Sequence, residues 1–269
     1  MRVESHSRGG VGCAMSPAGQ VAQCRSRVGP RPRQAARYSA AMCNLYHLAP
    51  RLHVETYFRV QLAPEYRELA VGPFNTGLFL RPAPEGLAAV FGQWGMIAPG
   101  SKTRRPTSRA ILTNNARAET VDSRPTYRQA WRSAQRCLIP AAWYQEPNWE
   151  TGKNIWWRLR RVDGEPWALA GLWSEWTDPE SGEIVPSYTM ITINCDGHPL
   201  LGRLHKPDPK LPPDAQDKRS VVPLAPADWA AWLGGDEARA RSLLAVPPAA
   251  LYDPSDAQRT DDALGLFAP

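Results

Sequence analysis

The middle of the chain is dominated by short runs of β-branched and aromatic residues, and these runs constrain the fold more than any other feature. Residues 155–160 and 167–172 lie on either side of Asp163-Gly164, a dipeptide typical of a tight hairpin turn. Residues 188–193 form a further predicted strand. We therefore expect an α+β fold, a single domain around a curved, barrel-like, mostly antiparallel sheet with peripheral helices.

Other segments have the apolar spacing of short helices. They are residues 51–61, 126–135, 226–233 and 236–244, the last two separated by a pair of glycines. A strand end is expected at 110–112, and the final stretch, 247–269, is expected to wrap the surface or to fray. We find no internal repeat and no interdomain linker, so one domain from 42 to 246 is expected.

Residues 1–41 differ from the rest because they are rich in Arg, Ser, Gly, Ala and Pro and lack periodic apolar residues. Three interpretations are open: a mitochondrial-type presequence, a disordered arm, or a start codon placed too far upstream. A secretory signal would need an apolar stretch that this segment lacks. An upstream start explains the composition most simply, since glycine and proline pairs interrupt a presequence helix.

The formal charge of +6 does not by itself indicate DNA binding. Residues 1–41 contain seven Arg and one acid, whereas the rest of the chain contains 25 basic and 25 acidic residues. Within that neutral remainder, 225–269 is acidic and 42–224 carries a formal +4. This distribution is compatible with a modest basic face and with no more than that.

Cysteine usage and hydropathy exclude several classes of protein. The five cysteines form no CxxC pair, so we expect neither a disulfide scaffold nor a zinc site, and no metal or other cofactor. Free thiols are typical of a reducing cytosol. No run approaches the roughly 20 apolar residues of a membrane helix, so no membrane association is expected.

Four local patterns could carry chemistry. They are Met42-Cys43, the polar cluster at 113–120, an apolar run at 136–146 that ends in an acid beside aromatics, and a histidine in the Pro-rich loop 202–207. Each alone has an ordinary structural explanation. These are a buried free cysteine, Asn115 and Arg117 capping a turn and pairing with Glu119, a solvated acid at a strand end, and a satisfied loop histidine.

Together the four patterns resemble the SOS response-associated peptidase family, whose members shield abasic sites in single-stranded DNA by covalent attachment. The resemblance rests on Met42-Cys43, the Asn-Ala-Arg-x-Glu-Thr element at 115–120, the run 138–146 and the loop 204–207, in the family's order. Residues 74–76 and 93–100 match two further family positions. Two departures concern DNA contacts. Asn44-Leu45 follows Met-Cys where Gly-Arg is common, and Pro207 replaces an Arg, leaving Arg203 or Lys206 as substitutes.

The resemblance also implies roles for individual residues. Cys43 would attack the abasic aldehyde, Asn115 would orient its amine, Glu146 would move protons, and His205 would protonate the sugar oxygen as the ring opens. The implied DNA-binding residues are Arg117 for a flanking phosphate, Trp94 and Trp143 for base stacking, and Asn75 and Lys206. The implied partner is single-stranded DNA with abasic sites. We expect a monomer in the bacterial cytosol, bound to the nucleoid with its DNA, with replication-fork proteins as further candidate partners.

An N-terminal Cys43, exposed by removal of Met42, would offer a thiol and an α-amine on adjacent carbons. The reference pKa of an α-amine is about 7.7–8.0, against about 10.4 for Lys, so its free-base fraction at neutral pH is larger by roughly a few hundred-fold. Such an amine can form a Schiff base with an aldehyde, and the thiol can then close a five-membered thiazolidine.

Two rival functions remain open from the sequence. An N-terminal Cys with Asn, Glu and His also fits a thiol autopeptidase, or an N-terminal-nucleophile amidohydrolase, that removes its own leader. Hydrolase chemistry of this kind would accompany or replace the lyase-type crosslinking chemistry. A non-catalytic nucleic-acid-binding module is the second rival, and it would bind reversibly with strong salt dependence.

Overall fold

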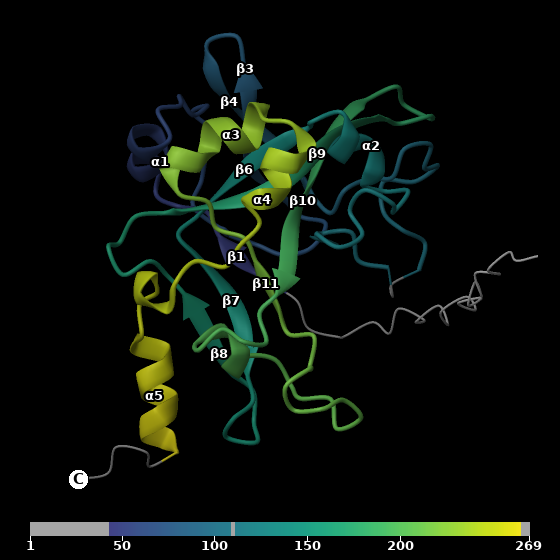
Figure 1. Cartoon of the computed structure of the whole chain (residues 1–269). Coiled ribbons are helices and arrows are strands. Elements are labelled where there is room, and N and C mark those ends of the chain that lie inside the picture. Colours follow the sequence, from purple (N-terminus) through teal and green to yellow (C-terminus); the bar gives the residue numbers. More distant parts are fainter. Residues whose placement is uncertain (1–42, 109–110, 265–269) are drawn as a thin grey trace, which may run out of the picture. The chain divides into compact units, whose positions relative to one another are not determined.

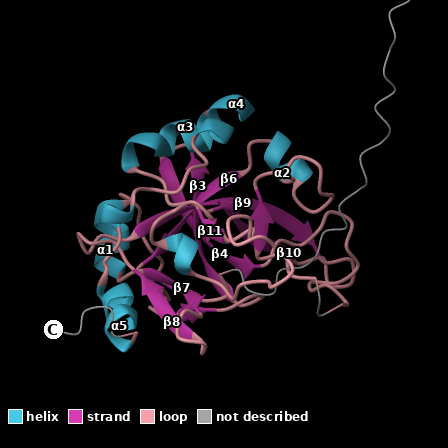
Figure 2. Cartoon of the chain, turned by 60° about the horizontal axis from the view of Figure 1, so that its bottom comes forward, coloured by secondary structure: helices cyan, strands magenta, loops and turns pink. Residues whose placement is uncertain are grey.

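The computed structural model describes residues 43–108 and 111–264 of the chain, which consist of strands joined by loops and short helices (Figures 1 and 2). The strands are β1 (Tyr46–His47), β2 (Ala70–Val71), β3 (Thr76–Ala83), β4 (Gly86–Trp94), β5 (Asn115–Arg117), β6 (Arg136–Ala141), β7 (Trp143–Asn148), β8 (Ile155–Leu159), β9 (Trp167–Thr177), β10 (Ile184–Asn194) and β11 (Arg219–Val221).

Five strands close into a barrel-like ring. β4, β3, β6, β9 and β10 pair antiparallel in that order, and a short parallel pairing of β10 with β4 closes the ring. β5 and β11 add to β10, parallel and antiparallel respectively. Every residue of β6 is buried, as expected for a strand covered on both faces. The expected curved, mostly antiparallel, barrel-like sheet is confirmed.

Close approach inside the ring depends on glycine. A Cβ added to Gly171 would lie 2.7 Å from Ile139 Cδ1 and 2.8 Å from the Thr189 carbonyl oxygen. Only a residue without a side chain allows β6, β9 and β10 to approach this closely.

The second sheet corrects one prediction. It is antiparallel with the order β2-β1-β7-β8, so β8 pairs with β7, whereas β9 pairs with β6 and β10. Both predicted strands around Asp163-Gly164 exist, but the predicted hairpin is wrong. The turn closes locally through an Arg161–Asp163 ion pair, and the chain then crosses from one sheet to the other. A turn motif such as Asp-Gly predicts a local reversal of the chain, but it does not determine which strands pair with each other.

The described helices are α1 (Arg51–Tyr57), α2 (Arg128–Arg132), α3 (Trp229–Gly234), α4 (Glu237–Ser242) and α5 (Ser255–Ala263), with 3₁₀ turns at Leu201–Arg203, Pro226–Asp228 and Ala249–Leu251. The first four are shorter than the helices predicted from apolar spacing, and α5 is a helix that the sequence reasoning did not predict. Arg59 (φ +51°) and Ala134 (φ +53°) adopt left-handed conformations just beyond α1 and α2, which a right-handed helix cannot continue through. The two predicted helices around Gly234-Gly235 are present as α3 and α4.

The C-terminal segment packs on the second sheet as far as it is described. Trp157 Nε1, on β8, donates a hydrogen bond to Thr260 Oγ1 of α5 at 2.8 Å, and the side chain of Thr260 is fully buried. Figure 1 shows α5 as the yellow helix beside β7 and β8. The predicted leader, residues 1–41, and the last five residues lie outside the described residues.

The predicted strand end at 110–112 is not a strand. Ile111 and Leu112 are 44% and 45% exposed, and residue 110 lies outside the described residues. The strand is the polar motif itself, since β5 pairs with β10 in the register Asn115 to Met190. Among the described residues, no helix has the length and apolar character needed to cross a membrane.

Candidate functional site

Cys43 lies buried at the start of the described chain, three residues before β1. Asn115 Nδ2 donates a hydrogen bond to its carbonyl oxygen at 2.8 Å, and Asn114 Nδ2 approaches the same oxygen at 3.3 Å. The thiol donates to the Leu45 carbonyl at 3.5 Å. Because β5 is held in the sheet by β10, both asparagines reach Cys43 from a rigid element.

Asn114 is a site residue that the sequence reasoning missed. It is fully buried, its Nδ2 also lies 3.3 Å from Asn44 Oδ1, and its backbone carbonyl accepts from Trp94 Nε1 at 2.9 Å. The sequence signal for Asn114 was its position directly before Asn115. Because Asn115 begins the short strand β5, the side-chain amides of both residues reach the carbonyl oxygen of Cys43.

Glu146, on β7, places a carboxylate next to the backbone nitrogen of Cys43. The side chain is buried, and burial raises its pKa well above the ordinary value, while the nearby backbone N–H of Cys43 lowers that pKa by less. Among the described residues, no side chain donates a hydrogen bond to either carboxylate oxygen. A protonated, buried acid beside this nitrogen is suited to proton transfer. Its burial excludes the alternative of a solvated strand-end acid.

His205 approaches the same carboxylate from the other side. Its φ is +64°, and its backbone N–H donates to the Pro147 carbonyl at 2.6 Å, which fixes it against β7. Nε2 lies 2.7 Å from the Arg219 carbonyl oxygen and 3.8 Å from Glu146 Oε2. A carbonyl only accepts, so Nε2 carries the hydrogen. The histidine is therefore held in one tautomer beside the acid.

The residue whose carbonyl binds His205, Arg219, is itself held by a network of ion pairs. Buried Arg219, which supplies the carbonyl contact, pairs with Glu119 at 2.8 Å and with Asp217 at 3.3 Å. Arg117 pairs with Asp217 at 2.7 Å, so the alternative pairing of Arg117 with Glu119 is wrong. Glu119 belongs to the same sequence motif as Asn115, and the motif therefore reaches the histidine through Arg219.

The predicted DNA-binding residues divide into two groups. Trp94 is fully buried, donates to a backbone carbonyl and lies edge-on to Tyr46, so its predicted stacking on bases is contradicted. It is one of the tryptophans that form the core. Asn75 and Lys206 are exposed and Trp143 is half-buried, and these three stay predictions.

Cys43, Asn115, Glu146 and His205 are therefore brought together from four distant parts of the chain. Burial raises the pKa of the Cys43 thiol well above its ordinary value, and the nearby Glu146 raises it further. Cys137 and Cys195 are buried and unpaired as well, and no described group of three or more His, Cys, Asp or Glu could hold a metal ion. The arrangement offers a thiol, a backbone nitrogen, a buried acid and a fixed imidazole at one point.

Comparison with known proteins identifies the family of this chain. The profile of the "SOS response associated peptidase (SRAP)" family matches residues 22–257, most of the chain. The chain belongs to the SRAP family. A crystal structure of a protein from Bordetella bronchiseptica has 34% sequence identity and a TM-score of 0.68, covering 78% of this chain and 97% of that one. A Bacteroides thetaiotaomicron structure, at 20% identity and a TM-score of 0.62, shares the fold.

Curated relatives of this SRAP chain have informative names. "Abasic site processing protein YoqW" of Bacillus subtilis is 30% identical over 132 residues, which are 49% of this chain and 56% of the relative. "Abasic site processing protein HMCES" of Xenopus tropicalis is 24% identical over 119 residues, which are 38% of this chain and 36% of the relative. The chain thus spans about half, or less, of the length of the curated relatives it matches.

Proposed function

We propose that this SRAP protein attaches itself covalently to abasic sites in single-stranded DNA through Cys43, once Met42 and everything before it have been removed. The observation that carries the proposal is that Cys43, Asn115, Glu146 and His205 lie together: Asn115 Nδ2 donates to the Cys43 carbonyl at 2.8 Å, and the buried Glu146 carboxylate lies near Cys43 and 3.8 Å from His205 Nε2. In the trimmed chain the Cys43 nitrogen is an α-amine, held by Asn115 in the same place. The names of the relatives YoqW and HMCES agree with abasic DNA as the substrate.

The proposed chemistry balances with one water released. The α-amine adds to the ring-opened aldehyde carbon, forming an N–C bond, and the resulting hydroxyl leaves as water after taking a proton. The thiol sulfur then adds to the imine carbon, and the thiol proton passes to the nitrogen. The product is a five-membered thiazolidine. No oxidant, reductant or metal takes part in these steps.

Glu146 and His205 supply the proton transfers. With its pKa raised by burial, Glu146 holds a proton that it can deliver to the departing hydroxyl and recover as the ring closes. Because the Nε2–H of His205 is engaged by the Arg219 carbonyl, the proton that His205 passes to the sugar oxygen as the deoxyribose opens is one bound at Nδ1, in the imidazolium form. The raised pKa of the Cys43 thiol keeps that proton in place until ring closure.

Binding of the strand would use the polar side chains around Cys43. Arg117 Nη1 is engaged by Asp217, and the rest of its half-buried guanidinium can contact a phosphate. Asn75, Lys206 and Trp143 are accessible enough to contact the backbone or bases. Single-strand preference follows if bases leave their stack to reach these groups.

The decisive assay incubates the protein with an abasic single-stranded oligonucleotide and runs a denaturing gel. Wild type should give a denaturant-resistant adduct, and Cys43→Ala should lose it. Cys43→Ser is the matched control, because it keeps the size and polarity of the side chain. Like Cys43→Ala it retains the amine and lacks the thiol, so only a labile Schiff base should form with either variant. An equally abundant stable adduct with Cys43→Ala would overturn the thiazolidine mechanism. Reversible binding alone would indicate the non-catalytic module.

Removal of the leader has its own test. A buried, protonated thiol is a poor nucleophile toward a peptide bond, so the structure gives autoproteolysis no direct support. Intact-mass analysis of the expressed full chain and of Cys43→Ala separates the two routes. Loss of residues 1–42 in wild type alone would establish self-cleavage, and loss in both would assign the trimming to another enzyme.

A further inference from the structure

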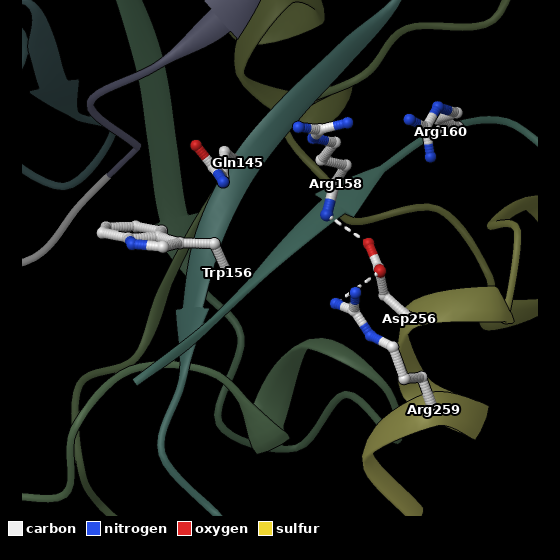
Figure 3. A pocket seen from close by; sticks show the side chains of 6 residues that line it. All are labelled: Gln145, Trp156, Arg158, Arg160, Asp256 and Arg259. Carbon is white, nitrogen blue, oxygen red and sulfur yellow. Dashed lines mark hydrogen bonds and ion pairs between the residues drawn. The ribbon is translucent and has the colours of Figure 1, made fainter. Parts of the chain in front are cut away.

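A cavity lies outside the group of residues used in the proposed chemistry. It has a volume of about 280 Å³ and opens between the outer face of β7–β8 and helix α5 (Figure 3). It is lined by Gln145, Trp156, Arg158, Arg160, Asp256 and Arg259.

Strand alternation explains this lining. Trp157 and Leu159 point into the core and are buried, so Trp156, Arg158 and Arg160 lie together on the opposite face of the sheet. Trp156 is 49% exposed. Its ring therefore presents an aromatic surface to solvent between two arginines.

The cavity is positively charged. Three arginines line it against one acid, and Asp256 is already engaged, pairing with Arg259 at 2.9 Å and accepting from the backbone N–H of Arg158. The guanidinium of Arg158 lies 5.2 Å from the centre of the Trp143 ring. Within the described part of the chain, neither Arg158 nor Arg160 forms a side-chain ion pair. Arg160 lies near Asp253, whose backbone N–H donates to the Arg160 carbonyl at 3.0 Å, so Arg158 is the arginine more available for an anion.

The cavity is connected to the Cys43 site through the sheet. The N–H of Gln145 donates to the Leu45 carbonyl at 2.9 Å, two residues after Cys43, and Gln145 pairs in register with Arg158. A row of neighbours, Leu45, Gln145 and Arg158, thus runs from the site to the cavity. Gln145 and Glu146 are adjacent on β7 and face opposite sides of it.

We infer that this cavity binds a nucleotide of the same DNA strand that flanks the abasic site, with the base stacked on Trp156 and the phosphate held by Arg158 and Arg160. An aromatic face beside two arginines whose guanidiniums form no close ion pair among the described residues matches the base and phosphate of one nucleotide. The inference rests on the proposed function for its ligand and names a subsite that the crosslinking residues do not form. Any base would be accepted, since every base has a stacking face.

The test measures binding of an intact single-stranded oligonucleotide, without an abasic site, by fluorescence anisotropy across a salt series. Trp156→Ala should raise the dissociation constant by about 5- to 150-fold, the usual effect of losing one stacked base. Arg158→Ala should reduce the slope of log K against log salt by about 0.7, as for one lost phosphate contact. Arg128→Ala, on exposed α2, is the matched control and should bind like wild type.

Both side chains are exposed, so the variants should fold, and thermal unfolding checks this. Wild-type affinity in either Trp156→Ala or Arg158→Ala would overturn the inference. Failure of the proposed function is separate, because it would appear as a wild-type protein that binds the strand and forms no abasic adduct. Abasic oligonucleotides truncated on the 5′ or the 3′ side then identify the flank. Only one truncation should abolish the difference between wild type and Trp156→Ala.

Discussion

Burial of Glu146 should make the protein less stable as pH rises, and Glu146→Gln should remove that loss. The substitution keeps the shape of the side chain and removes its ionisation. Burial raises the pKa of this carboxyl in the folded chain, whereas in the unfolded chain it is close to about 4.3. Below that pH both states hold the proton, and the two proteins should have similar stability.

The magnitude follows from proton linkage. Above the unfolded pKa the unfolded chain has released the proton and the folded chain has kept it, so the unfolded state binds fewer protons and stability falls as pH rises. One group contributes a slope of about 1.4 kcal/mol per pH unit, which ends when the pH reaches the folded pKa. Above about pH 5.5 the free energy of unfolding of Glu146→Gln should therefore exceed that of wild type by an amount that grows with this slope. The difference should level off once the pH passes the pKa of Glu146 in the folded chain.

Urea unfolding at half-unit pH steps measures this difference on chains that retain Met42. Cys43, Cys195 and Tyr144 are close enough to feel the Glu146 charge, but burial raises their pKa values, so they stay protonated in this range. Repeating the pair in a His205→Gln background removes the imidazole 3.8 Å away. A difference that stays constant from pH 4 to pH 8 would refute the raised pKa. In chains trimmed to Cys43 the slope should shrink, because an α-ammonium favours the carboxylate.

Three further substitutions test other parts of the account. Asn115→Ala removes the 2.8 Å hydrogen bond to the buried Cys43 carbonyl and should cost about 1–3 kcal/mol by urea unfolding, with slower adduct formation on gels. Trp94→Phe loses the hydrogen bond to the Asn114 carbonyl and should lower stability by about 1 kcal/mol while leaving affinity for single-stranded DNA unchanged; a weaker Kd would restore a stacking role. Gly77→Ala places a methyl against two buried tyrosine hydroxyls and should cost about 1–3 kcal/mol; an unchanged Tm would contradict this packing.

The sequence predicts the local elements better than their partners. The runs at 155–160, 167–172 and 188–193 are rich in apolar and aromatic residues, and each lies almost entirely in a strand of the structure; this signal is local. Which strand pairs with which depends on contacts across the whole sheet, so the turn at Asp163-Gly164 predicted a hairpin that does not exist. Helix ends were missed for a similar reason, since Arg59 becomes left-handed in a tertiary setting that spacing does not report.

The candidate site shows the same division. Resemblance named Cys43, Asn115, Glu146 and His205, and the fold brings all four together. The burial of individual side chains could not be predicted from the sequence. Trp94 is fully buried and Trp156 is 49% exposed, although both are tryptophans. The support of His205 by a backbone carbonyl was also invisible, since a carbonyl oxygen has no signature in the sequence.

The central claim is that the reacting nitrogen belongs to an N-terminal Cys43. Intact-mass spectrometry of the adduct with an abasic single-stranded oligonucleotide tests it directly. The account predicts one species, whose mass equals the chain beginning at Cys43 plus the oligonucleotide minus one water. A stable adduct whose protein part still carries Met42 or any residue before it would contradict the account, because that nitrogen would be an amide and could not form an imine.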